Sequence, residues 1–246
     1  MSAVENPLRS AQPSQKLIVA IDGPAGAGKS TIARHLARHF GLLNLETGAM
    51  YRAFALKALR AGISLDLPSG EQIKALKILA DETQISLEPG DDENRVLLDG
   101  EDVTGLIRNQ MVTDAASRVS VYPAIRAWMV SLQQEMGASG GVVMEGRDIG
   151  TVVFPQAQVK IFLDAAPEVR GMRRFDQLGP QPIHPPEEVI RDLRARDERD
   201  RNRADSPLKA APDAVLLDST DMTLDEAVKA AEAIVAARLG GSADAS

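Results

Sequence analysis

The octapeptide Gly23-Pro24-Ala25-Gly26-Ala27-Gly28-Lys29-Ser30 matches the pattern G-x-x-x-x-G-K-[ST]. An apolar run at 17–21, rich in β-branched residues, precedes it and predicts a buried strand. Apolar residues at helical spacing follow it and predict a helix over 31–40. A strand, a glycine loop and a helix N-terminus in this order form an anion site, because the loop N–H groups and the helix dipole both favour negative charge.

The last residues of this motif predict the nature of the anion. Lys29 is expected to reach the outer phosphates of a nucleoside triphosphate, and the Ser30 hydroxyl is expected to bind Mg²⁺. The alternative is a plain glycine-rich connector, which gives no reason for a Lys and a Ser at the first helical turn. The residues predicted to bind the ATP phosphates are Gly23, Pro24, Ala25, Gly26, Ala27, Gly28, Lys29, Ser30 and Thr31.

The composition suits one medium-sized domain with a full core. The 246 residues are 44% hydrophobic and include no cysteine, which excludes a disulfide framework and thiol chemistry. The net charge of −7 argues against broad nucleic-acid binding, so an anionic ligand must be held by local positive charge. No apolar run approaches the length of a membrane span. The lack of cysteine is compatible with a reducing, cytoplasmic location, and no exposed apolar stripe stands out. We predict a cytoplasmic monomer with neither a nucleic-acid nor a membrane partner.

Strands and helices are predicted to alternate along most of the chain. Segment 1–15 lacks the apolar core of a signal peptide, and both it and 240–246 are predicted to be disordered tails. Residues 16–239 are predicted to form a single α/β domain with a parallel, doubly wound sheet. The five expected core strands lie at 17–21, 42–45, 141–145, 158–163 and 214–217.

A segment with a different sequence pattern interrupts this alternation of strands and helices. Short β-prone pieces over about 83–105 are separated by turns at 89–92 and 99–100, which predicts a small antiparallel insert.

Thr47 is a plausible N-cap for a helix that runs to about 60. A further amphipathic helix is expected over 69–81, with Ile73, Leu76, Lys77 and Ala80 on one side.

A cluster of charges follows the third core strand. The segment Glu145-Gly146-Arg147-Asp148-Ile149-Gly150 comes directly after the apolar run at 141–144. Ligands of open α/β sheets bind outside the carboxyl ends of the strands, so Arg147 and Asp148 are predicted to contact a ligand. A salt bridge within the loop is the alternative.

A second cluster of charges occupies 191–203, which holds six arginines and four acidic residues. The plain interpretation is a solvated helix with ion pairs between neighbouring turns. However, the spacing of Arg196, Asp200 and Arg203 places them on one face. Two arginines around one acid suit a phosphate, a ribose or a base edge.

Several longer stretches resemble one family. They are IDGPAGAGKST, LETGAMYR, VVMEGRDIGTVVFP, KIFLDA, RDERDRNR with SPLK after it, and LLDST, and they span about 16–237. The chain resembles the bacterial cytidylate kinases of the nucleoside monophosphate kinase superfamily. The resemblance implies a P-loop fold with strand order 2-3-1-4-5, a nucleoside-monophosphate-binding region with its insert at about 62–140, and a short lid at about 173–195.

The resemblance also implies an activity, namely transfer of the γ-phosphoryl group of ATP, with Mg²⁺, to CMP or dCMP. Lys29, Arg147 and Arg196 are the implied catalytic residues, and Ser30 the implied metal ligand. Arg52 and Arg147 fall where relatives hold the acceptor phosphate. The implied CMP-binding residues are Thr47, Tyr51, Arg52, Ser117, Arg126, Arg147, Asp148, Arg196, Asp200 and Arg203.

Two positions depart from the family pattern, and two other functions stay open. Thr47 stands where relatives often carry serine, and it keeps the hydroxyl; Glu145 stands where some carry aspartate, which leaves its role at the metal undefined. A kinase for AMP, UMP, GMP or a small metabolite such as shikimate would share the phosphate loop. A P-loop switch or regulatory ATPase is the alternative from another class, but the sequence lacks an Asn-Lys-x-Asp element for guanine.

Overall fold

The computed structural model describes residues 17–65, 69–90, 93–177 and 185–240. Within them, five parallel strands form the main sheet in the order β2-β6-β1-β7-β8. Numbered among the core strands alone, this is the predicted order 2-3-1-4-5. The strands are β1 (Ile18–Asp22), β2 (Leu43–Glu46), β6 (Val142–Gly146), β7 (Val159–Asp164) and β8 (Val215–Asp218).

Every core strand lies one residue later than predicted. The apolar residues that open two of the runs, Leu17 and Leu42, are buried but lie outside the strands. At the other end, pairing continues into a polar or glycine residue, such as Asp22 in β1 and Gly146 in β6. The carboxyl edge of the sheet therefore carries more acidic side chains than hydrophobicity alone predicted.

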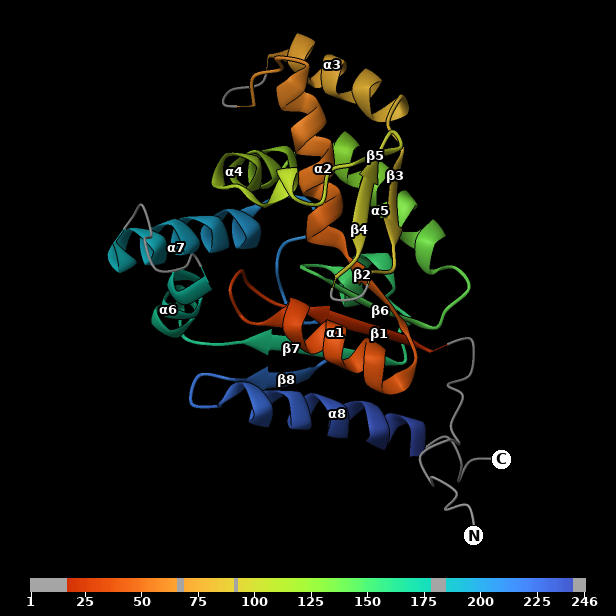
Figure 1. The fold of residues 1–246 in the computed structure, drawn as a ribbon, viewed down its shortest axis with the longest axis vertical. Helices are drawn as coiled ribbons and strands as arrows, with labels where there is room; N and C mark the ends of the chain where they lie inside the picture. The colour runs from red at the N-terminus through yellow and green to blue at the C-terminus, as the bar shows by residue number, and fades with distance from the viewer. Residues whose placement is uncertain (1–16, 66–68, 91–92, 178–184, 241–246) are drawn as a thin grey trace, which may run out of the picture.

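Helices cover both faces of the sheet. On one face, α1 (Lys29–Phe40) and α8 (Leu224–Gly240) pack on the inward side chains of β1 and β7. Figure 1 shows α1 in front of β1, and α8 below β8. On the other face, α5 (Pro123–Gly137) and the π-helical turn η2 (Ile149–Val153) pack on β6. Burial on both faces explains why these strands are apolar without alternation.

A second core lies beside the sheet and forms around α2 (Thr47–Arg60). It includes Phe54 of α2 together with side chains of α3 (Gly70–Asp81), α4 (Gln110–Val119) and α5. The predicted insert is confirmed as an antiparallel sheet in the order β3-β4-β5, and Ile85, Val96 and Leu98 bury its inner face in this same core. Its elements are β3 (Ile85–Glu88), β4 (Arg95–Leu98), β5 (Glu101–Asp102) and the 3₁₀ turn η1 (Leu106–Arg108).

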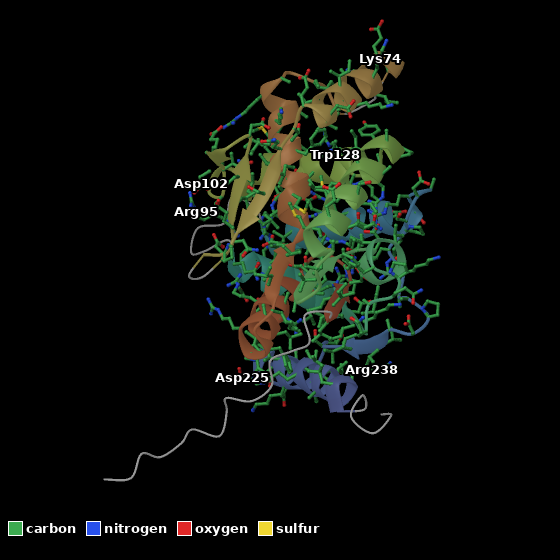
Figure 2. All side chains as sticks on the ribbon, turned by 90° about the vertical axis from the view of Figure 1, so that its right-hand side faces the viewer. Lys74, Arg95, Asp102, Trp128, Asp225 and Arg238 are labelled. Carbon is green, nitrogen blue, oxygen red and sulfur yellow. The ribbon has the colours of Figure 1, made fainter. Side chains whose placement is uncertain are left out.

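The second core and α8 lie at opposite ends of the molecule. Figure 2 shows Lys74 of α3 at one end, and Asp225 and Arg238 of α8 at the other. Trp128 lies within the second core, where its ring is 5.1 Å from that of Phe54. The antiparallel insert packs on this same second core through Ile85, Val96 and Leu98, so it belongs to the end of the molecule formed by α2–α5.

Two helices lie against the phosphate-loop motif, as Figure 1 shows to the left of β7. They are α6 (Pro167–Gln177) and α7 (Pro186–Asn202), which pack on each other. Helix α7 begins five residues before the arginine-rich stretch at 191–203, and Arg203 is its C-cap. The predicted tails lie outside the described residues, except that Gly240 ends α8.

Two local predictions were wrong. Thr47 is the first residue of α2 and not its N-cap, because its hydroxyl donates to the Glu145 carbonyl across the sheet. On α3, Leu76 and Ala80 of the predicted face are buried, but Ile73 is 40% exposed and Lys77 is also exposed, so the core covers only part of that face. Over the described part of the chain, no helix combines the length and apolar character needed to cross a membrane.

Candidate active site

The phosphate-loop motif is confirmed as the connection between β1 and α1. Gly26 and Gly28 have φ values of 75° and 95°, and Gly28 is the N-cap of α1. A Cβ at Gly23 would lie 1.9 Å from the Leu163 carbonyl oxygen of β7. Glycine is therefore required at Gly23 by close packing and at the other two positions by backbone conformation.

Lys29 is buried at the first turn of α1, and its Nζ donates to the Pro24 carbonyl at 2.7 Å. Burial lowers the pKa of Lys29, and the nearby Arg147 and Arg196 guanidinium groups lower it further. A cation destabilised in this way gains from a bound anion, because the anion's charge offsets both the burial and the repulsion.

The carboxylate of Glu145 lies beside the start of α1. It accepts a hydrogen bond from the Ser30 hydroxyl, while its buried Oε1 finds no partner among the described residues. Burial raises the pKa of Glu145, and the Glu46 carboxylate raises it further. A hydroxyl oxygen and a carboxylate oxygen that has no hydrogen-bond partner are ligand atoms that suit a hard divalent cation.

Residues from α6 and α7 fix the backbone of Ala25 in the phosphate loop. Arg170 of α6 is 2% exposed and donates from Nη1 to the Ala25 carbonyl at 2.9 Å. The same Nη1 lies 2.6 Å from Asp197 Oδ2 of α7, and the Ala25 N–H donates to Asp197 Oδ1 at 3.4 Å. Both polar groups of one loop residue are thus held by a buried ion pair from the neighbouring helices.

A chain of alternating charges joins α5, the loop after β6, and α7. Arg126 donates from Nη2 to Asp148 Oδ2, and Arg203 lies 3.7 Å from the other oxygen of Asp148. Arg203 is also 3.9 Å from Asp200, which accepts from Arg147 Nε at 2.8 Å. The predicted residues Arg126, Arg147, Asp148, Asp200 and Arg203 are therefore brought together, and the solvated-helix interpretation fails for this face of α7.

Arg196 lies at the end of this network nearest the phosphate loop. Its buried Nε makes no hydrogen bond within the described chain, and burial together with Arg147 lowers its pKa to about 10. Lys29, Arg147 and Arg196, which come from three different elements, thus repel one another at one place. In a protein of net charge −7, this local positive charge points to a phosphate ligand.

The other predicted residues surround the network. The Thr47 hydroxyl donates to the Glu145 carbonyl at 2.7 Å, and Arg52 donates to Glu46 at 2.5 Å. Burial raises the pKa of Tyr51 to about 12. Ser117 of α4 is buried and accepts from Arg199 of α7 at 3.3 Å, which links the second core to α7.

Sequence patterns missed several residues of this site. Asp22, at the end of β1, accepts hydrogen bonds from the N–H groups of Ile149 and Gly150, both at 2.7 Å. Burial raises its pKa to about 6. Its position directly before the phosphate-loop motif was the available signal. Arg170 and Asp197 gave no such signal, because each lies among several other charged residues in the sequence.

Together, the glycine loop that opens α1, the parallel sheet behind it and the arginines that converge on Lys29 define a P-loop kinase. The model of the family described as "Cytidylate kinase" matches residues 19–237. The chain belongs to the cytidylate kinase family.

Individual relatives agree with this result. The cytidylate kinase of Solibacter usitatus (strain Ellin6076) is 48% identical over 233 residues, which cover 94% of this chain and 97% of the relative. The cytidylate kinase of Pasteurella multocida (strain Pm70) is 44% identical over 216 residues, or 87% of this chain and 93% of the relative. A solved structure of shikimate kinase from Acinetobacter baumannii aligns with 92% of this chain and 94% of its own, at 17% identity and a TM-score of 0.42.

Proposed function

We propose that the chain transfers the γ-phosphoryl group of ATP to CMP or dCMP, giving ADP and CDP or dCDP. The observation that carries this proposal is the convergence of Lys29, Arg147 and Arg196 between the phosphate loop and the Arg126–Asp148–Arg203–Asp200 network. Two anionic nucleotides can meet there, one on each side of the three cations.

ATP binds along the phosphate loop in this proposal. The motif from Gly23 to Thr31 surrounds the phosphates. Its backbone N–H groups face them except at Pro24, which has none, and at Ala25, whose N–H donates to Asp197. Lys29 exchanges the Pro24 carbonyl for phosphate oxygens. The ion pair between Arg170 and Asp197 keeps the Ala25 peptide in place. These residues act by position and charge, which is what phosphoryl transfer requires of a protein.

CMP binds over the charged network and the second core. Arg52 and Arg147 hold the acceptor phosphate, and Arg196 and Lys29 neutralise the charge that spreads over the migrating group. The remaining residues contact the base and sugar: Thr47, Tyr51, Ser117, Arg126, Asp148, Asp200 and Arg203. CMP therefore replaces arginine–aspartate contacts with arginine–phosphate and aspartate–hydroxyl contacts.

Mg²⁺ fits beside the phosphate loop. Ser30 and Glu145 would hold the ion, since the unpartnered Oε1 of Glu145 lies next to the Ser30 hydroxyl. When bound with ATP, the ion would neutralise phosphate charge. The replacement of aspartate by glutamate at this position keeps the carboxylate, so the longer side chain does not exclude the role.

Water must be kept from the phosphates, because otherwise ATP would be hydrolysed. No general base is needed, since the acceptor is an ionised phosphate. The predicted lid region at about 173–195 includes the end of α6 and the first part of α7. Contacts of these two helices with Ala25 connect them to the phosphate loop. We propose that this region closes over the nucleotides, and that the enzyme is a cytoplasmic monomer.

Release of ADP with a panel of nucleoside monophosphates tests this function. We expect turnover with CMP and dCMP to exceed turnover with AMP, GMP or no acceptor by orders of magnitude. Chromatography should show the matching diphosphate as the product. A slow ATPase that ignores CMP would instead support the switch class, and a preference for another monophosphate would overturn the assignment of CMP. Lys29→Ala, assayed in parallel, controls for contaminating kinases.

A further inference from the structure

Two histidines and one glutamate converge on the face of the molecule where α1 packs on α8. His35 Nε2 lies 2.5 Å from Glu232 Oε1, and His39 Nδ1 lies 3.0 Å from the same oxygen. The ligand atoms of the three residues all lie within 4.8 Å of one another. None of these residues belongs to the active site proposed above, because His35 is six residues, or about 9 Å of helix, beyond Lys29.

The cluster is built on rigid elements. His35 and His39 are one turn apart on α1, and their rings stack with centroids 6.0 Å apart. The His39 and Phe40 rings pack in a T-shaped arrangement with their centroids 4.7 Å apart. Glu232 follows Ala231, which is fully buried with Leu36 in the seam between the two helices. The three side chains therefore start from fixed positions on one surface.

The ligand types and spacing suit a transition metal. Imidazole nitrogens and a carboxylate oxygen bind Zn²⁺ at about 2.0–2.2 Å, so neighbouring ligand atoms in a tetrahedral site lie about 3.3–3.5 Å apart. The two nitrogens here would move away from Glu232 Oε1 by less than about 1 Å to reach that geometry. Side-chain rotation allows this, because the two histidine side chains are 42% and 52% exposed.

We propose that His35, His39 and Glu232 form a binding site for Zn²⁺ or a similar divalent transition metal, with water as the fourth ligand. The ion would replace the protons that the histidines share with Glu232, and it would link α1 to the C-terminal helix. Mg²⁺ would not compete, since it prefers oxygen ligands alone. The site is therefore separate in place and in metal preference from the one proposed at Ser30 and Glu145.

Titration of the tag-free protein with Zn²⁺ and with Co²⁺, in excess Mg²⁺ and without nucleotide, tests the proposal. We expect one strong site per chain, a Co²⁺ absorption spectrum typical of nitrogen and oxygen ligands, and a melting temperature that rises with Zn²⁺. His39→Ala and Glu232→Gln should each weaken binding at least about tenfold. The double variant His35→Ala/His39→Ala should abolish it and leave activity with CMP unchanged.

The chain supplies a matched control, because its sequence contains three histidines and the third is His184. His184→Ala should bind Zn²⁺ as the wild type does. The proposal is overturned if the double variant retains the strong site, if His184→Ala loses it, or if the wild type binds Zn²⁺ no more tightly than the double variant. The last result would make the cluster an ordinary hydrogen-bonded ion pair between the two helices.

Discussion

The two sides of the active site are held in different ways. At the phosphate loop, glycine conformations and the Arg170–Asp197 pair fix a short stretch of backbone. Across the site, Arg126, Asp148 and Arg203 come from three separate segments and hold one another by charge. The backbone of the phosphate loop is therefore in position before phosphate binds. The paired side chains of Arg126, Asp148 and Arg203 must instead exchange partners when CMP binds.

The largest effect is expected at Lys29, where the two sides meet. Lys29→Ala should lower kcat by about 10³–10⁵-fold, because the charge on the migrating phosphoryl group loses a buried cation. The variant should remain folded, since it removes a destabilised charge. Steady-state kinetics and circular dichroism provide the measurement. A folded variant with wild-type turnover would remove the phosphate-loop assignment.

A smaller effect, on stability, is expected from the buried pair behind the loop. Arg170→Met should lower the free energy of unfolding by about 3–5 kcal/mol, because Asp197 is left buried without its partner. Urea denaturation measures this. Arg194→Met is the matched control, since Arg194 pairs with Glu168 between the same two helices but both side chains are more than half exposed. Equal shifts in the two variants would mean that the buried pair adds nothing specific.

The same contrast explains what sequence could predict. The strand–loop–helix geometry of the phosphate loop was predicted correctly because it follows from contiguous residues, glycine conformation and one following helix. The parallel sheet agreed with prediction, since apolar runs report burial directly, and its strand order is the one that the family resemblance implied. The Arg196, Asp200 and Arg203 face was predictable because helical spacing groups these residues.

The missed residues depend on contacts between distant segments. Asp22 meets the backbone of Ile149 and Gly150, which lie more than a hundred residues later, and no local pattern encodes that contact. Asp197 is buried while its neighbour Glu198 is exposed, and only the position of α6 distinguishes them. Thr47 was misassigned as a cap because its true partner, the Glu145 carbonyl, lies on another strand.

Asp22 gives a pH-dependent prediction about the backbone side of the site. Its pKa rises from 3.8 to about 6 in the folded protein, so its contribution to stability is complete below pH 3.8 and is lost as the pH rises through 6. The stability of the wild type relative to Asp22→Asn should fall by about 2.4 kcal/mol between pH 4 and pH 7. Denaturation of both proteins across this range measures the difference. If the stability of the wild type relative to Asp22→Asn stays constant or increases with pH, burial does not raise the pKa of Asp22.

The smallest effect concerns the insert at about 83–105. We expect CMP to slow hydrogen exchange there, because the insert shares a core with α2, α4 and α5 and should move with them as one unit. Described residues 83–90 and 93–105 are the ones to compare, with α8 as the internal control. Identical exchange with and without CMP would show that the insert does not take part in closure.

The central claim is that one face of α7 recognises CMP. Its test is kcat and KM for CMP, dCMP and ATP in Arg196→Ala, Asp200→Ala and Arg203→Ala, with Arg191→Ala as the control from the exposed face of the same helix. Arg203→Ala should cost about 2–4 kcal/mol in kcat/KM for CMP, because charged hydrogen bonds are lost in a closed site, while KM for ATP should change much less.

Asp200→Ala should impair CMP and dCMP unequally if Asp200 contacts the ribose 2′-hydroxyl, and Arg191→Ala should behave as the wild type. Near-wild-type constants for CMP in all three variants of the buried face would contradict the account. They would return α7 to a solvated helix and leave the recognition of CMP to Arg126, Arg147 and Asp148.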